Sequence, residues 1–158
     1  GACEHAREAS TYSIEATADG QGAAAEADII VTITPATKPI IPDAWVRPGT
    51  HISCAGADMP GKQELASALV ARAAVNVDDR EQSVASGELE IPVAEGAITP
   101  EDIKAELGEV IAGTATGRSD DEQVTVFDTS GIAVQDLSAS KIAYDRAVEA
   151  GLGTVVEL

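Results

Sequence analysis

The sequence predicts an α/β fold with a largely parallel sheet. The first supporting observation is a set of short runs rich in β-branched residues, which are typical of strands buried on both faces. The second is that segments of helical character separate these runs, as in βαβ units. The third is the composition. The chain has 158 residues with 44% hydrophobic and only 3% aromatic side chains, enough for one domain with a core of Ala, Val, Ile and Leu.

Glycine and proline divide the first part of the chain into short elements. The run 28–34 is the clearest strand, because it is almost continuously β-branched and stops at Pro35. We expect it to be buried on both faces. The other elements expected here are a helix over 2–10, a short strand over 12–16, helical turns over 23–27 and around Trp45, and a second buried strand over 51–55.

The remainder of the chain continues the alternation. Thr99 is a predicted N-cap, with Pro100 at the first helical position and acidic residues in the first turn, and we expect this helix to end near Gly113. The polar segment 117–123 is either a surface loop or a domain boundary. The other expected elements are a helix over 63–73, a strand over 75–78, a helix over 81–86, a strand over 124–128, a long amphipathic helix over 131–150 and a short strand at 155–156.

The composition and charge of the chain exclude several classes of protein. The chain has 27 acidic and 10 basic side chains and a net charge of −17, which disfavours nucleic-acid binding. No stretch of sequence is apolar enough to cross a membrane, and the two cysteines and two histidines lack metal-ligand spacing. The acidity and the scarcity of lysine predict a cytoplasmic protein from a high-salt organism; the alternative is an ordinary acidic protein.

Three predicted strands end in small or hydroxyl residues, at Thr34, at 54–58 and at 128–131. In open α/β sheets, ligands bind beyond the carboxyl ends of the strands. Asp58 at such an end could carry a proton or hold a substrate ammonium group, and Lys62 could pair with Asp58 or with a phosphate. The alternative is that Asp58 caps the following helix. His51, within a strand, is expected to be packed or hydrogen-bonded.

The segment 56–65, Gly-Ala-Asp-Met-Pro-Gly-Lys-Gln-Glu-Leu, resembles the signature of the ornithine cyclodeaminase/mu-crystallin family, and most of all its archaeal alanine dehydrogenase branch. The segments 77–82, 108–113 and 126–137 are similar to later motifs of that family in the same order. The resemblance runs from about Ala27 to near the end of the chain. It implies a Rossmann-type NAD(P) domain and a homodimer.

The resemblance also assigns regions and residues. It implies that 1–128 form the later half of the NAD(P) domain, and that 129–158 form a hinge and a C-terminal helix and strand that join a substrate and dimerisation domain. The family's catalytic aspartate falls on Asp58, and a position near the substrate falls on Ser130. The positions near the cofactor fall on Thr34, Cys54, Ala55, Gly56, Ala57, Lys62 and Thr129.

The implied function is an NAD-dependent oxidoreductase that interconverts L-alanine, or a similar amino acid, with its 2-oxo acid and ammonia. NADP is not excluded as the cofactor. The alternatives are ornithine cyclodeaminase, ketimine reductase, a non-catalytic nucleotide-binding protein similar to mu-crystallin, or a half-chain of a hetero-oligomer. The family's glycine-rich fingerprint falls before Gly1. We therefore expect this stretch alone to be an inactive fragment that binds NAD weakly.

Overall fold

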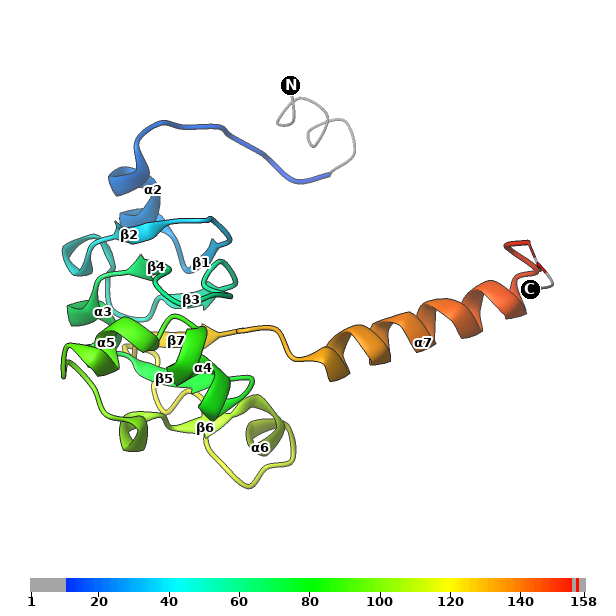
Figure 1. Cartoon of the computed structure of the whole chain (residues 1–158). Helices are drawn as coiled ribbons and strands as arrows, with labels where there is room; N and C mark the ends of the chain where they lie inside the picture. Colours follow the sequence, from blue (N-terminus) through cyan, green and yellow to red (C-terminus); the bar gives the residue numbers. More distant parts are fainter. Residues whose placement is uncertain (1–10, 155, 157–158) are drawn as a thin grey trace.

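The computed structural model describes residues 11–154 and 156 (Figure 1). Its centre is a five-stranded sheet in the order β1-β3-β7-β5-β6, with every neighbouring pair parallel. The strands are β1 (Ile29–Thr32), β3 (His51–Cys54), β5 (Ala74–Val77), β6 (Ala105–Glu106) and β7 (Thr125–Asp128). The expected α/β fold with a parallel sheet is confirmed. The last strand in sequence, β7, lies in the middle of the sheet.

Short helices cover one face of the sheet, which we call the covered face. They are α3 (Ser67–Arg72), α4 (Arg80–Ser86) and α5 (Glu90–Ala94). Leu69 of α3 and Leu89 before α5 form one buried cluster with Ile52, Val75 and Val126 of the three central strands. The helix expected over 81–86 is confirmed: Asp79 caps its start and Gly87 follows its end. Helix α5 was not predicted.

The other face of the sheet, which we call the open face, is much less protected. Ile29 and Val31 of β1 lie on it and are 66% and 65% exposed, whereas Thr32, which points to the covered face, is buried. The expectation that 28–34 is buried on both faces is therefore wrong. In the described part of the chain, β1 is an edge strand whose only neighbour is β3, and no helix covers its outward-facing residues.

A second, two-stranded sheet corrects another prediction. β2 (Thr37–Ile41) pairs in parallel with β4 (Gln63–Leu65), so the helix expected over 63–73 begins only at Ser67. The backbone explains the change, since Gln63 N–H donates to the Ala36 carbonyl over 3.0 Å. A partner this distant in sequence overrides the local helical preference.

The single helix expected over 99–113 is also wrong. The structure divides it into a 3-10 turn η2 (Pro100–Asp102), strand β6 and helix α6 (Leu107–Ile111). Thr99 and Asp102 do form a capping box. The helix stops there because Lys104 N–H donates to the Val75 carbonyl over 2.8 Å, which aligns the next residues with β5.

The predicted elements of the N-terminal part of the chain are confirmed in part. Helix α2 (Gly20–Glu26) is capped by Asp19 and packs beside the 3-10 turn η1 (Asp43–Trp45), so both expected helical turns are confirmed. The strand expected over 12–16 is absent, since those residues have no regular structure. The expected helix over 2–10 and residue 155 of the last expected strand lie outside the described residues.

Helix α7 (Ala133–Glu149) follows β7 and extends away from the sheet (Figure 1). None of its 17 residues is buried, although Val134, Leu137, Ile142 and Val148 are apolar. The long helix expected over 131–150 is thus confirmed. Within residues 11–154, no helix has both the length and the apolarity that a membrane span needs. The division into 1–128 and 129–158 stays a prediction.

Candidate active site

Three strand ends meet at the carboxyl edge of the sheet. Thr32, Cys54 and Asp128 are aligned neighbours at the last positions of β1, β3 and β7. The pairing continues beyond them, because Ala55 N–H donates to the Thr32 carbonyl over 2.8 Å and Thr129 N–H to the Cys54 carbonyl over 2.9 Å. The segments that carry the predicted site residues therefore leave the sheet side by side.

Asp58 and Lys62 form an ion pair beyond the end of β3, with 2.5 Å between Lys62 Nζ and Asp58 Oδ1. Gly61, with a φ of 81°, turns the chain so that the two side chains meet. The Asp58 side chain remains 59% exposed, and the hydrogen bond from Lys62 lowers the pKa of Asp58 below its ordinary value. Asp58 is thus an ionised, accessible carboxylate at neutral pH, able to accept a proton or bind an ammonium group.

The alternative role of Asp58 as a helix cap is wrong. Residues 63–65 after it form β4, and the next helix, α3, has Ala66 as its N-cap, without a side-chain cap. Of the two partners expected for Lys62, the structure shows Asp58, and pairing with a phosphate stays a prediction.

Thr34 is half-buried, and both its N–H and its hydroxyl donate to Glu64 Oε1, over 2.7 and 2.8 Å. Gly56 N–H donates to the other oxygen of the same carboxylate over 3.0 Å. The sequence did not point to Glu64. Glutamate is almost always a surface residue, and only the fold reveals that this one is fully buried.

Thr129 and Ser130 are held by a second carboxylate, Asp78 at the end of β5. Their hydroxyls donate to it over 3.2 and 2.8 Å, and Ser130 N–H and Gly131 N–H donate to it as well. Burial raises the pKa of Asp78, but the hydrogen bonds from Ser130, Gly131 and Asp79 outweigh it and lower the pKa overall. Both hydroxyl protons point inward, so toward a ligand these oxygens could act only as acceptors.

The four small residues 54–57, at and just beyond the end of β3, are in close contact with their surroundings. Cys54 and Ala57 are buried, and Cys54 points to the covered face, while Ala55 is half-buried. A side chain at Gly56 is excluded, because its Cβ would lie 2.4 Å from the Thr34 carbonyl oxygen. A strand edge with small residues and half-buried hydroxyls suits a flat ligand such as a dinucleotide. The residues present therefore fit NAD.

Two further buried carboxylates lie under this edge. Glu88 and Asp128 are fully buried. Burial raises the pKa of Glu88 to about 8, and the negative charges of Asp128 and Glu64 add to that shift. Burial likewise raises the pKa of Asp128 to about 7, with Asp78 and Glu64 adding to it. Both side chains are thus largely or partly protonated at neutral pH.

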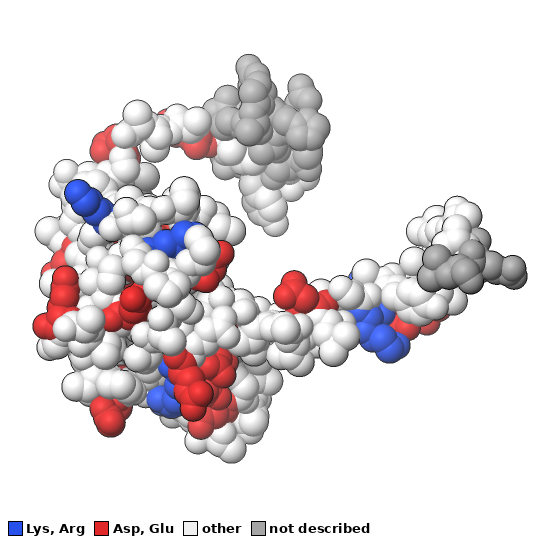
Figure 2. All heavy atoms as spheres, in the orientation of Figure 1, with Lys and Arg blue, Asp and Glu red and all other residues white. Residues whose placement is uncertain are grey.

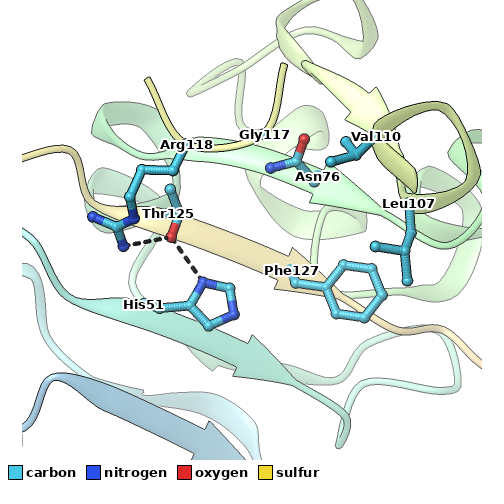
Figure 3. A pocket seen from close by; sticks show the side chains of 8 residues that line it. All are labelled: His51, Asn76, Leu107, Val110, Gly117, Arg118, Thr125 and Phe127. Atoms are coloured by element: carbon cyan, nitrogen blue, oxygen red, sulfur yellow. Dashed lines mark hydrogen bonds between the residues drawn. The ribbon is translucent and has the colours of Figure 1, made fainter. Parts of the chain in front are cut away.

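A separate hollow of about 380 Å³ lies on the open face, between the sheet and the segment around Arg118 (Figure 3). Phe127 and Leu107 give it apolar walls. His51 Nδ1 lies 2.7 Å from Thr125 Oγ1, to which Arg118 also donates over 3.0 Å. His51 is hydrogen-bonded as expected, and burial, then Arg118, lowers its pKa. None of the described residues that line this hollow is acidic.

The charged side chains on the surface are mostly acidic. Figure 2 shows acidic side chains scattered over the visible face with only a few basic ones between them. In the described residues, no three His, Cys, Asp or Glu side chains come together in a way that could hold a metal ion. The prediction of a high-salt origin stays a prediction.

Comparison with known proteins gives a consistent result. Residues 2–151 match the model of the ornithine cyclodeaminase/mu-crystallin family. The chain is 43% identical over 134 residues to an alanine dehydrogenase of Archaeoglobus fulgidus, covering 85% of this chain and 42% of that protein. It is 42% identical over 142 residues to a Δ1-pyrroline-2-carboxylate reductase of Bacillus cereus, covering 89% and 43%. The chain thus spans less than half the length of these relatives.

Solved structures agree with these matches. An archaeal alanine dehydrogenase dimer with bound NAD superposes with a TM-score of 0.82 and 42% identity, covering 87% of this chain and 43% of that one. The Δ1-pyrroline-2-carboxylate reductase of Thermococcus litoralis, in complex with NADH and L-proline, superposes with a TM-score of 0.83 and 35% identity over the same shares. Both similarities support the α/β fold with a parallel sheet.

Proposed function

The chain belongs to the ornithine cyclodeaminase/mu-crystallin family, and on this premise we propose that the protein is an NAD-dependent oxidoreductase that interconverts L-alanine, or a similar amino acid, with its 2-oxo acid and ammonia. The observation that carries the proposal is the exposed Asp58 carboxylate, ionised beside Lys62 at the carboxyl edge of the sheet. The similarity to the alanine dehydrogenase of Archaeoglobus fulgidus supports the choice of substrate.

The residues of this chain have distinct tasks in the proposal. NAD, when bound, accepts the two electrons that leave the amino acid. Thr34, Ala55, Gly56 and Thr129 would border the cofactor at the strand edge, and Ser130 would lie near the substrate. Asp58 binds the substrate amino group and takes up the proton released when water adds at the α-carbon. Asp58 is ionised at neutral pH and can accept that proton, and the hydrogen bond from Lys62 lowers its pKa further and holds the carboxylate in place.

Reduction of a cyclic imine is the second candidate. The 42% identity to a Δ1-pyrroline-2-carboxylate reductase of Bacillus cereus favours it, as does the fit to the Thermococcus litoralis reductase with NADH and L-proline. An iminosuccinate reductase of Paracoccus denitrificans is similarly close, at 44% identity over 85% of this chain and 41% of that one. Each of these reactions moves a proton as well as a hydride, so we expect the candidates to differ in substrate rather than in the use of Asp58.

The assembly belongs to the proposal too. We infer a homodimer that acts in the cytoplasm, in line with the archaeal alanine dehydrogenase, which is described as a dimer. The intact mass of the native complex, compared with the denatured mass of the polypeptide, tests the dimer. The expected ratio is two.

The function is tested by steady-state turnover of the full-length protein, with pyruvate and ammonium, pyrroline-2-carboxylate, iminosuccinate or ornithine as substrates and NADH or NAD as cofactor. Pyruvate and ammonium should give the highest kcat/KM. Asp58→Asn should lower kcat by about 10²- to 10⁴-fold while NADH binding stays nearly unchanged. Asp121→Asn removes a carboxylate from an exposed loop and is the matched control.

Three outcomes would contradict the proposal. Wild-type turnover in Asp58→Asn would remove this residue from the mechanism. A preference for pyrroline-2-carboxylate would replace the alanine reaction by imine reduction. A protein stabilised by NADH that consumes none would instead be a binding protein. We expect the 158-residue chain by itself to be inactive.

A further inference from the structure

Glu64 is a buried carboxylate that the proposed reaction does not use. It belongs to β4 in the small second sheet and is fully buried, yet it has no basic partner among the contacts of the described residues. A buried carboxylate is costly unless its oxygens accept hydrogen bonds. Those of Glu64 do, and the donors come from the two strand ends that border the proposed cofactor site.

The geometry is that of a clamp. Glu64 Oε1 accepts from Thr34 N–H and from the Thr34 hydroxyl, over 2.7 and 2.8 Å, and Oε2 accepts from Gly56 N–H over 3.0 Å. Thr34 follows β1 and Gly56 follows β3, beyond the last pairing of these strands, where Ala55 N–H donates to Thr32. One carboxylate therefore holds together two segments that the sheet no longer joins.

The two segments joined by the clamp are closely packed at Gly56. A Cβ at Gly56 would lie 2.4 Å from the Thr34 carbonyl oxygen and 2.5 Å from the Glu64 carboxyl group. The backbone of one segment is thus pressed against the other, with the carboxylate beside both. Small displacements of either segment would change the direction of Asp58, which follows Gly56 by only two residues.

Further carboxylates fix Glu64 itself. Glu88 accepts from Glu64 N–H with both oxygens, each over 3.0 Å, and from Leu65 N–H over 2.6 Å. Asp128 at the end of β7 accepts in turn from Glu88 N–H over 3.1 Å. A chain of three buried carboxyl groups therefore connects the end of β7 to the ends of β1 and β3.

We propose that Glu64 is a positioning residue that fixes the ends of β1 and β3 against each other, so that Thr34 and Asp58 face one cofactor and substrate site in a constant geometry. The effect of Glu64 on catalysis rests on the proposed function. Its protection of the Thr34 and Gly56 backbone amides is independent of that function. Turnover falls when the clamp loosens, because reacting groups then leave their productive arrangement.

The test is Glu64→Gln in the full-length protein, read by kinetics and by amide hydrogen exchange. Glutamine keeps the shape but leaves only one oxygen to accept, so one strand end loses its partner. We expect exchange at Thr34 or Gly56 to accelerate, while Ala55, whose N–H bonds to Thr32, stays protected. We expect kcat to fall about 10- to 100-fold, with a smaller change in the KM for the oxo acid.

The matched control is Glu81→Gln, which removes the same charge from an exposed position of α4 and should change neither readout. Wild-type kcat and wild-type exchange in a folded Glu64→Gln protein would overturn the proposal. If that variant does not fold, exchange in the wild type decides: Thr34 and Gly56 amides that exchange as fast as exposed loop amides overturn the clamp. Absence of turnover in the wild type would refute the proposed function but leave the exchange test valid.

Discussion

Two kinds of carboxylate lie at the same edge of the sheet and behave in opposite ways. Asp58 is exposed, bound to Lys62, and has a lowered pKa. Glu64 follows it by only six residues, yet it is fully buried, as are Glu88 and Asp128. The exposed acid has a cation as its partner, whereas the buried acids have backbone N–H groups. Differences in solvation and in partners, rather than residue type, separate Asp58 from the buried acids.

Removing one of the buried acids should have the largest effect on stability. Glu88→Ala leaves the N–H groups of Glu64 and Leu65 without acceptors and opens a cavity. We expect a loss of about 3–5 kcal/mol in the free energy of unfolding. Denaturant titration measures it, with Glu81→Ala on the exposed side of α4 as the control. A loss below about 1 kcal/mol would show that Glu88 is not a structural acceptor.

The second effect is a dependence of stability on pH. The pKa values of Glu88, about 8, and Asp128, about 7, lie above those of the unfolded chain, so the folded state holds protons that the unfolded state releases. The stability from these protons is complete below about pH 4 and is lost as the pH rises through about 7 to 8. Unfolding free energy should therefore fall by about 3 kcal/mol between about pH 6.5 and pH 9.

Glu88→Gln checks the origin of that slope, because it keeps the size of the side chain and removes its titration. The variant should show a flatter profile than the wild type over the same range. Acids with lowered pKa values, such as Asp78 and Asp102, act in the opposite direction and only at lower pH. A slope that is unchanged in Glu88→Gln would assign the dependence to other groups.

Asp78 stands between the two kinds, since it is half-buried and also has a lowered pKa. Asp78→Asn removes an acceptor for the hydroxyls of Thr129 and Ser130. We expect a loss of about 1–2 kcal/mol, between that of the buried and the exposed acids. Thermal unfolding measures it beside Asp121→Asn. A loss as large as that of Glu88→Ala would make Asp78 part of the buried scaffold.

The smallest effect should come from breaking the ion pair of Asp58 and Lys62. Lys62→Met removes the partner of Asp58, so the pKa of Asp58 should return upward toward its ordinary value, as measured by an NMR titration. The change in stability should be small, because the Asp58 carboxylate of the pair is 59% exposed, although the Lys62 side chain is only 15% exposed. An unchanged Asp58 pKa would show that the pair does not form in solution.

The sequence predicted the central strands but not how they are arranged. The apolar runs that became β3, β5 and β7 are local signals, which a periodicity reading detects. Strand β4 was hidden inside an expected helix, because its pairing with β2 depends on residues more than twenty positions away. The exposure of β1 could not be predicted either, since it reflects which faces the helices cover.

The site divides in the same way. Asp58 and Lys62 are four residues apart, and the sequence already offered their pairing as one of two choices. Glu64 and Asp78 were missed, although the segments that contain them had been singled out by resemblance. Their roles follow from hydrogen bonds to residues 30 and 52 positions away, which no local pattern encodes.

Cys54, at the end of β3, gives the molecule a chemical reporter. It is fully buried, and burial, then the neighbouring carboxyls of Glu88 and Asp128, raises the pKa of its thiol well above the ordinary value. An alkylating reagent reacts with the thiolate, so labelling must wait until the strand edge opens. With Cys3 replaced, only one thiol remains in the chain. The rate of its labelling would then report how often this edge opens.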